Sequence, residues 1–501
     1  MKRLGSKRWT VTRFYCGVLF LALAKVSAAD FPPTVPPPKP FQLPLPAVRV
    51  LSNGVRVAVI ERHGLPIVTL RLVILAGAEA DPPDLPGTAQ LTAALLDQGT
   101  TTRTEQEIAQ TIDRIGGTID TGAEWDNSFA EISVLTDHTE LAFNLLADLI
   151  LHPAFSPAEI ERQRKQSLSA LEVAQNDPAY IADAVFDRLT FDGTPYGHPP
   201  DGTAESLRRI SGENIREFYS QNYGPSNSIL FIVGDIRTDE ADSLAARFFA
   251  GWSRERLPAS ARVTAKVMSL GGEALAQENR RIVVIDKPDA VQTEIRIGNR
   301  AISRTGTDYL ALSVANQILG GPATNRLFQA LRTEHGLTYS ASSELDCYKT
   351  LGSWESKTFT RTSETMKSVR LVLDQMKRMR DQPISGAELH TAQSYLAGHL
   401  ALEVESSEGI ATQMLNLMVY DLPLDYWNHF PEDLRNLQAD EVLNATQRYL
   451  DPDRDVIVLV GNAATFSREL KKLGNVRVVP IQRLDLASPD LERHAEAAGN
   501  P

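Results

Sequence analysis

An internal repeat with a very long period constrains the fold of this 501-residue chain more than any other feature. Tyr223-Gly224-Pro225 leads through Ile229–Val233 into Gly234, and Tyr449-Leu450-Asp451-Pro452 leads through Val456–Val460 into Gly461. The two glycines lie 227 residues apart, and each copy sits between two helical patterns. Duplication at this spacing indicates two similar halves rather than a solenoid. The length also exceeds what one hydrophobic core normally serves.

Strand and helix patterns alternate along the first half with short connections. The β-branched residues and turn signals predict strands at Val55–Ile60, Ile67–Leu75, Thr118–Ala123 and Ser128–Leu135. Helices are predicted from about Gly87 to Asp97, from Thr104 to the Gly116-Gly117 pair, and from Ser156 to near Pro178. Such interleaving indicates a sheet covered by helices.

Composition places the chain among soluble globular proteins, with 43% hydrophobic and 23% charged residues. The formal net charge is −12, and it becomes −18 without the six Lys/Arg of the first 29 residues. Nucleic acids and anionic membranes attract basic surfaces, so neither is an expected partner. Cys16 and Cys347 are the two cysteines.

The first 29 residues have the pattern of a secretory signal. Basic residues precede the apolar run Phe14–Ala24, and small residues end at Ala28-Ala29. We therefore expect an exported protein, with the periplasm as its location. An uncleaved anchor is the alternative, although no later stretch approaches the length of a stable membrane span. If residues 1–29 are removed, Cys347 has no partner for an intrachain disulfide.

Composition shifts divide the chain into six expected parts. The predicted boundaries are a signal peptide at 1–29, a proline-rich extended segment at 30–47, a first domain at 48–252, a linker at 253–280, a second domain at 281–479 and a tail at 480–501.

Two motifs in the sequence resemble those of a known family. The stretch from Gly77-Ala78-Glu79 through Gly87-Thr88-Ala89-Gln90 to Gly99-Thr100 is similar to the flanks of the active-site helix in the pitrilysin/insulinase family of metallopeptidases. Asn325-Arg326-Leu327-Phe328 and Gly336-Leu337-Thr338-Tyr339-Ser340 resemble the second half of the family. The resemblance extends from Val48 to about Val479. It implies an α+β fold of two homologous α/β-sandwich halves, each a mainly antiparallel sheet covered by helices.

The family's zinc motif, His-x-x-Glu-His, is replaced here. Two His at i and i+4 share one helical face and bind zinc, while the Glu accepts a proton from the metal-bound water. The resemblance maps these positions onto Gln90, Ala93 and Ala94, the third zinc ligand onto Ala170, and its supporting acid onto Gln163. We therefore expect this chain to bind no metal.

Other residues offer no obvious replacement site. Glu172 lies two residues past Ala170, about 200° around a helix. The histidines at 63, 138, 152, 390 and 399 form no pair at ligand spacing, so surface or core histidines are the better interpretation.

Arg332 and Tyr339 match a pair that family members present to the substrate. A guanidinium and a phenol are suitable hydrogen-bond donors to a carbonyl that is becoming an oxyanion. The alternative interpretation is structural: Arg332 pairs with Glu334 or another carboxylate, and Tyr339 is a half-buried strand residue.

The resemblance implies a non-catalytic subunit that pairs with a zinc-bearing homologue in a heterodimer. Zinc is then expected in the partner, and peptides or unfolded small proteins are the expected substrates. The strand Thr118–Glu124 corresponds to the family's peptide-aligning edge strand, or it simply packs on its neighbour. Two alternatives stay open: a stand-alone peptide-binding or scaffold protein, and a hydrolase with an unrecognised site. The sequence contains no nucleophile motif that favours the hydrolase.

Overall fold

Two six-stranded sheets organise the part of the chain that the computed structural model describes, which is residues 42–253, 279–322, 325–488 and 490–493. These described residues belong to one compact unit, Phe41–Pro501. The predicted signal peptide, most of the proline-rich segment and most of the predicted linker lie outside the described residues.

The first sheet has the strand order β1-β2-β6-β3-β5-β4. Only β2 and β6 pair in parallel, and the other neighbours are antiparallel. Strands β4 and β5 have the bounds predicted from the sequence. The strands are β1 (Ala47–Val50), β2 (Arg56–Glu61), β3 (Ile67–Ile74), β4 (Thr118–Ala123), β5 (Ser128–Leu135) and β6 (Ser228–Gly234).

The second sheet has the order β12-β7-β11-β8-β10-β9. Its central β11 pairs in parallel with β7 and antiparallel with β8, as β6 pairs with β2 and β3 in the first sheet. The sequence repeat therefore marks equivalent central strands, and the predicted fold class is confirmed. The strands are β7 (Arg281–Asp286), β8 (Gln292–Ala301), β9 (Ala341–Cys347), β10 (Gly352–Arg361), β11 (Val456–Gly461) and β12 (Val476–Pro480).

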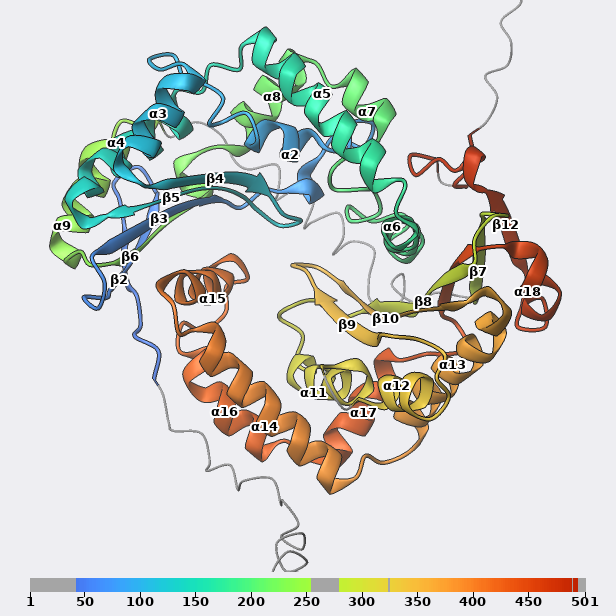
Figure 1. The fold of residues 1–501 in the computed structure, drawn as a ribbon. Helices are drawn as coiled ribbons and strands as arrows, with labels where there is room; N and C mark the ends of the chain where they lie inside the picture. Colours follow the sequence, from blue (N-terminus) through green and yellow to red (C-terminus); the bar gives the residue numbers. More distant parts are fainter. Residues whose placement is uncertain (1–41, 254–278, 323–324, 489, 494–501) are drawn as a thin grey trace, which may run out of the picture. The chain divides into compact units, whose positions relative to one another are not determined.

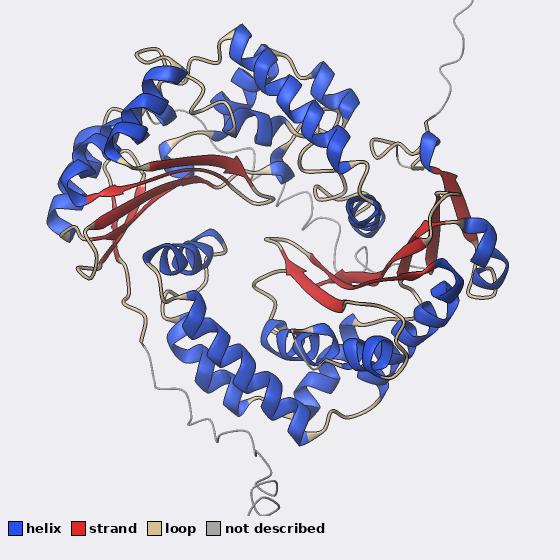
Figure 2. Cartoon of the chain, in the orientation of Figure 1, coloured by secondary structure: helices blue, strands red, loops and turns tan. Residues whose placement is uncertain are grey.

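Helices connect and cover the strands (Figures 1 and 2). Thr104 and Glu107 form the predicted capping box of α3. Among the described residues, no helix is long and apolar enough to cross a membrane. The first-half helices are α2 (Thr88–Ala93), α3 (Glu105–Ile115), α4 (Thr139–Leu151), α5 (Pro157–Ala174), α6 (Pro178–Thr190), α7 (Ala204–Arg209), α8 (Gly212–Asn222) and α9 (Thr238–Phe249). The second-half helices are α11 (Tyr309–Gly320), α12 (Arg326–Phe328), α13 (Thr365–Asp381), α14 (Gly386–Glu403), α15 (Ser407–Val419), α16 (Tyr426–Asn436), α17 (Ala439–Tyr449) and α18 (Ala463–Leu470).

The two halves exchange one covering helix each. Helix α6 lies between α5 and α7 in the first half of the chain, yet it packs on β8 and β11 of the second sheet (Figure 1). Helix α15 comes from the second half and packs on β6 of the first sheet. Each sheet therefore buries one face against its own helices and part of the other against a helix from the opposite half.

The contact of α6 with the second sheet is apolar and close. Val185 and Phe186 are fully buried in one cluster with Val458 of β11. A Cβ on Gly298 of β8 would lie 3.0 Å from Phe186 Cζ and 2.1 Å from the backbone oxygen of Trp354. Only glycine fits at this position, so the sheet sequence is matched to the helix that covers it.

Charged residues surround this apolar contact. Glu344 and Glu355 lie directly opposite each other on β9 and β10, where like charges repel. Lys357 Nζ lies 2.7 Å from the Glu344 carboxylate and 3.2 Å from that of Glu355, and it also contacts Asp183 of α6 at 3.5 Å. The lysine therefore joins both strands to the exchanged helix.

Phe186→Ala should lower the free energy of unfolding by about 3–5 kcal/mol, because it removes a fully buried ring and leaves a cavity between α6 and the second sheet. Urea denaturation measures this. The control Val173→Ala, on a side chain that is 73% exposed, should change stability by less than about 0.5 kcal/mol. Equal effects of the two substitutions would contradict the packing described.

The pH dependence of the free energy of unfolding should reveal the titration of Asp187 in α6. Burial, reinforced by the nearby charges of Asp346, Asp183 and Glu344 and opposed by Lys357, raises the pKa of Asp187 to about 7. A folded-state pKa above the unfolded value means that the folded chain binds more protons between these values. This group therefore makes the free energy of unfolding fall as pH rises from about 4 to about 7.

Asp187→Asn should remove that contribution and stabilise the chain at pH 8 by roughly 2 kcal/mol, a value reduced from the full shift because the side chain is only partly buried. Thermal unfolding across this pH range measures it. Asp113→Asn, on the exposed side of α3, should leave the pH profile unchanged. A profile for Asp187→Asn that matches the native chain would refute the assignment.

Candidate functional site

Helix α2, which carries the predicted zinc positions Gln90 and Ala93, is short, and hydrogen bonds fix its N-terminus. Asp81 accepts hydrogen bonds from the backbone N–H groups of Gly87 at 2.6 Å and Ala89 at 2.7 Å. Gly87 has φ +90°, a left-handed conformation that favours glycine. Burial raises the pKa of Asp81 well above its usual value, although both backbone bonds oppose the change. Helix α2 ends at Ala93 and not at Asp97 as predicted, because the chain turns after Ala94.

The side chain of Gln90 is hydrogen-bonded to the neighbouring edge strand. Its Oε1 accepts a hydrogen bond from the backbone N–H of Ala123 at 2.8 Å. Ala123 is the last residue of β4, the strand at the open edge of the first sheet. The position that resembles the first zinc ligand therefore holds a neutral amide, which satisfies one outward-facing donor of that edge.

The other predicted zinc positions carry no metal-binding atom or lie apart on α5. Ala93 is fully buried and Ala94 partly buried at the end of α2. Gln163 is partly buried and Ala170 exposed, both on α5. The intervening Arg164 is buried, and it donates to the backbone oxygen of Leu207 and pairs with Glu161.

This set of side chains does not fit a zinc ion. Structural and catalytic zinc sites use thiolate, imidazole or carboxylate ligands. Three of the five positions hold a methyl group, and the amide oxygen of Gln90 is already bonded. Within the described ranges, no group of three His, Cys, Asp or Glu residues is arranged to hold a metal ion.

Arg332 and Tyr339 lie together on the surface of the second half. Arg332 Nη1 donates to the backbone oxygen of Tyr339 at 2.9 Å, and its guanidinium carbon lies 4.5 Å from the centre of the Tyr339 ring. The ring of Phe328 lies 4.9 Å away on the same guanidinium. Tyr339 is 73% exposed rather than half-buried, and no ion pair between Arg332 and Glu334 is present among the described residues. The half-buried Tyr339 and the Arg332–Glu334 ion pair of the structural alternative are therefore wrong in detail, while the role of the pair stays a prediction.

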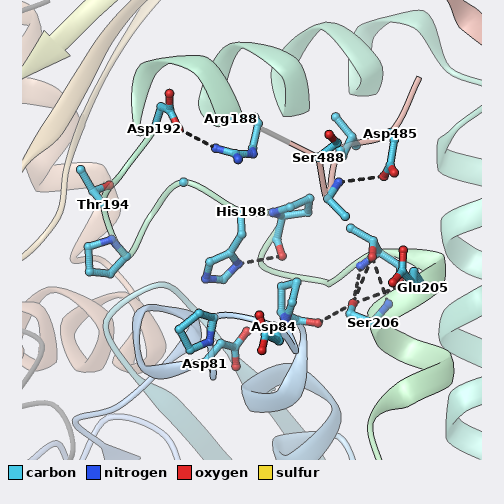
Figure 3. A pocket seen from close by; sticks show the side chains of 18 of the residues that line it. Asp81, Asp84, Arg188, Asp192, Thr194, His198, Glu205, Ser206, Asp485 and Ser488 are labelled. Atoms are coloured by element: carbon cyan, nitrogen blue, oxygen red, sulfur yellow. Dashed lines mark hydrogen bonds and ion pairs between the residues drawn. The ribbon is translucent and has the colours of Figure 1, made fainter. Parts of the chain in front are cut away.

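Sequence reasoning missed a cavity of about 680 Å³ beside the start of α2 (Figure 3). Its walls come from residues 79–86, from residues 188–209 between the end of α6 and the end of α7, and from residues 485–488. Glu79 was quoted only as a flank of the active-site motif. No spacing in the sequence connects these three stretches, because only the tertiary fold brings them together.

Asp126 was missed for the same reason. Its carboxylate accepts hydrogen bonds from the Tyr196 hydroxyl at 2.7 Å, the Tyr420 hydroxyl at 3.2 Å and the backbone N–H of Lys349 at 2.9 Å. These donors come from both halves of the chain. Burial raises the pKa of Asp126, while the hydrogen bonds oppose that effect.

Family models match both halves of the chain. The model for "Insulinase (Peptidase family M16)" matches residues 56–199, and the model for "Peptidase M16 inactive domain" matches residues 209–396. The chain belongs to the insulinase family of peptidases, family M16. Within that family, it is a member whose zinc-ligand positions hold glutamine and alanine.

Relatives and solved structures agree with this assignment. An uncharacterized zinc protease of Mycobacterium leprae is 28% identical over 364 residues, which are 72% of this chain and 76% of that protein. The uncharacterized zinc protease YmxG of Bacillus subtilis is 23% identical over 356 residues, which are 71% of this chain and 84% of that protein.

A peptidase M16 inactive domain from Pseudomonas fluorescens superposes with a TM-score of 0.74 at 27% identity, over 87% of this chain and 99% of that chain. A protease from Helicobacter pylori superposes with a TM-score of 0.75 at 16% identity, over 83% of this chain and 100% of that chain. At this identity, the similarity supports the fold alone.

Gln90→Ala should expose the amide of Ala123 and speed its hydrogen exchange by roughly fivefold to tenfold, the factor expected for one lost hydrogen bond. Hydrogen-exchange mass spectrometry on peptides that contain Ala123 measures the change. Gln163→Ala is the matched control, since the structure gives that side chain no hydrogen bond among the described residues. Unchanged exchange in Gln90→Ala would show that the amide does not depend on this bond.

Proposed function

We propose that this chain is an exported, non-catalytic subunit of a peptidase and that it pairs with a zinc-bearing homologue of its own family. The single observation that carries the proposal is a contrast within one chain. The predicted zinc positions hold glutamine and alanine, whereas Arg332 and Tyr339 are exposed and held together.

The geometry of the pair suits contact with a peptide from outside. The guanidinium has five N–H donors, and its hydrogen bond to the backbone oxygen of Tyr339 uses one of them. Its contacts with two aromatic rings restrict the side chain without consuming the remaining donors. The exposed Tyr339 hydroxyl adds another donor. Donors held in place in this way stabilise the developing oxyanion of a peptide carbonyl without reorganisation.

In this proposal the partner supplies zinc and the general base, and this chain supplies Arg332 and Tyr339. Peptides or unfolded small proteins are the substrates. The relatives described as zinc proteases make a zinc-bearing partner of similar fold a reasonable expectation. Export to the periplasm is proposed from the signal pattern of residues 1–29.

A stand-alone peptide-binding protein is the second candidate, and strand β4 favours it. Along an edge strand, every second residue points its backbone N–H group away from the sheet. The N–H groups of Thr121 and Ile119 therefore lie on the same open side as that of Ala123. A peptide could pair with these two residues by strand addition. Gln90 blocks that pairing at Ala123.

Kinetics of the mixed complex test the proposal. The chain without residues 1–29 is combined with a homologue from the same organism that carries His-x-x-Glu-His. Arg332→Ala should lower kcat/KM for peptide hydrolysis by about 10²–10³-fold, and Tyr339→Phe by about tenfold or more, while the complex stays assembled. Arg114→Ala on exposed α3 and Tyr395→Phe on α14 are the matched controls.

Three results would contradict the proposal. Full activity of the Arg332→Ala complex would remove the role of the pair. Peptide hydrolysis by this chain alone would favour an unrecognised site. Peptide binding without any association with the homologue would favour the stand-alone candidate.

A further inference from the structure

Arg332 lies in a helical segment that departs from regular α-helical geometry. After the short helix α12, residues Gln329–Thr333 form a π-helical turn, in which the N–H of Glu334 donates to the backbone oxygen of Gln329 at 2.9 Å, five residues earlier. Turns of this kind are rare, and they are frequent at functional sites. A π-helical turn is wider than an α-helical one, so it changes the direction in which Arg332 points.

The backbone before this turn is fixed by hydrogen bonds and an ion pair. Asn325 is buried, and its side chain accepts from the backbone N–H of Phe328 at 2.6 Å and donates to the backbone oxygen of Gly321. Arg326 pairs with Glu388 of α14 at 2.7 Å. These contacts hold the backbone of Phe328 in place where the π-helical turn begins.

Burial fixes the rotation of the segment about its own axis. Leu327, Ala330 and Leu331 are buried in a hydrophobic core cluster. Phe328 is only half-buried and Arg332 is exposed, so both side chains point away from that core. Side chains four residues apart are neighbours on a helix surface, and the ring and the guanidinium therefore meet.

The chain after the π-helical turn folds back toward Arg332. Gly336 has φ +60°, in the left-handed region that favours glycine, and the N–H of Leu337 donates to the backbone oxygen of Leu331 at 2.8 Å. Leu337 is buried, which anchors the returning chain. Tyr339 is thereby placed where its backbone oxygen accepts from Arg332 Nη1 at 2.9 Å.

Two aromatic rings contact the Arg332 guanidinium, and no carboxylate pairs with it among the described residues. Its central carbon lies 4.9 Å from the centre of the Phe328 ring and 4.5 Å from that of the Tyr339 ring. A carboxylate would neutralise the cation and use its N–H groups, whereas an aromatic face attracts the cation and accepts none of the five in-plane donors. The rings therefore restrict the guanidinium and leave its charge and donors for a ligand.

We propose that Phe328 is a positioning residue, whose ring, set by the Asn325 cap and the π-helical turn, orients Arg332 toward the peptide carbonyl. This role rests on the proposed function, because it concerns the same site. Phe328 acts through Arg332, since its own side chain has no hydrogen-bond donor or acceptor.

Nuclear magnetic resonance of the chain without residues 1–29, prepared with isotope-labelled arginine, tests the orientation in the absence of any partner. The Arg332 Nε–H signal is identified as the one lost in Arg332→Lys. Phe328→Leu should shift this signal and lower its heteronuclear NOE, because the ring that shields and restricts the group is gone. Phe328→Tyr keeps the ring and should retain the native values. Phe248→Leu, which removes a ring 4.7 Å from the Arg247 guanidinium on α9, should leave the Arg332 signal unchanged.

Kinetics of the mixed complex test whether catalysis uses that orientation. Phe328→Leu should lower kcat for peptide hydrolysis by about threefold to fivefold with little change in KM, since one exposed cation–π contact to a transition-state donor is lost. Added to Arg332→Ala, which has already removed the guanidinium, Phe328→Leu should lower kcat no further. A residue that only stabilises the fold would lower kcat by the same factor in both backgrounds.

An unchanged Arg332 signal in Phe328→Leu overturns the proposal, and so does an equal loss of kcat with and without Arg332. If Arg332→Ala lowers activity and Phe328→Leu does not, the positioning role is wrong and the proposed function stands. If neither lowers activity, the proposed function fails and the positioning role fails with it. Phe328→Met, which also lacks the ring, decides the same points if the leucine variant does not fold.

Discussion

Helix α6 belongs by sequence to the first half of the chain, but its apolar face is buried against β8 and β11 of the second sheet. Fully buried Phe186 reaches the backbone of Gly298, where no other residue would fit. Helix α15 makes the reverse contact on β6. Each sheet thus has part of one face covered by a helix of the opposite half. The exchange therefore makes one folding unit from two similar halves, and it places the stretch after α6 next to α2, where the cavity forms.

The chemistry of the chain is divided unevenly between those halves. In the first, the predicted zinc positions are part of an ordinary helix, with Ala93 in the core and Gln90 hydrogen-bonded to the edge strand. In the second, a cation and a phenol stay exposed with defined geometry.

Much of the fold could be predicted from the sequence, because local patterns decide it. The bounds of β4 and β5 follow from alternation and turn residues, and the repeat located the central strands β6 and β11. Helix α2 was predicted too long, since its end depends on a turn after Ala94 and not on composition. The sheet on which α6 packs could not be predicted from the sequence. An apolar helical face indicates that a helix is buried but not which sheet it covers.

The candidate functional site, like the fold, could be predicted from the sequence only in part. Motif flanks were enough to predict Gln90, Ala93 and Ala94 as the counterparts of zinc-motif positions and to select Arg332 and Tyr339. They gave no indication that Gln90 would bond Ala123, or that Glu79 would face a cavity with residues more than 400 positions away. Those contacts depend on tertiary packing between distant segments.

The most direct test of the central claim is the zinc content of the purified chain and of its complex with the His-x-x-Glu-His homologue, determined by elemental analysis and native mass spectrometry. The account predicts one zinc ion per heterodimer, carried by the homologue, and none on this chain alone. Stoichiometric zinc on this chain by itself would contradict it.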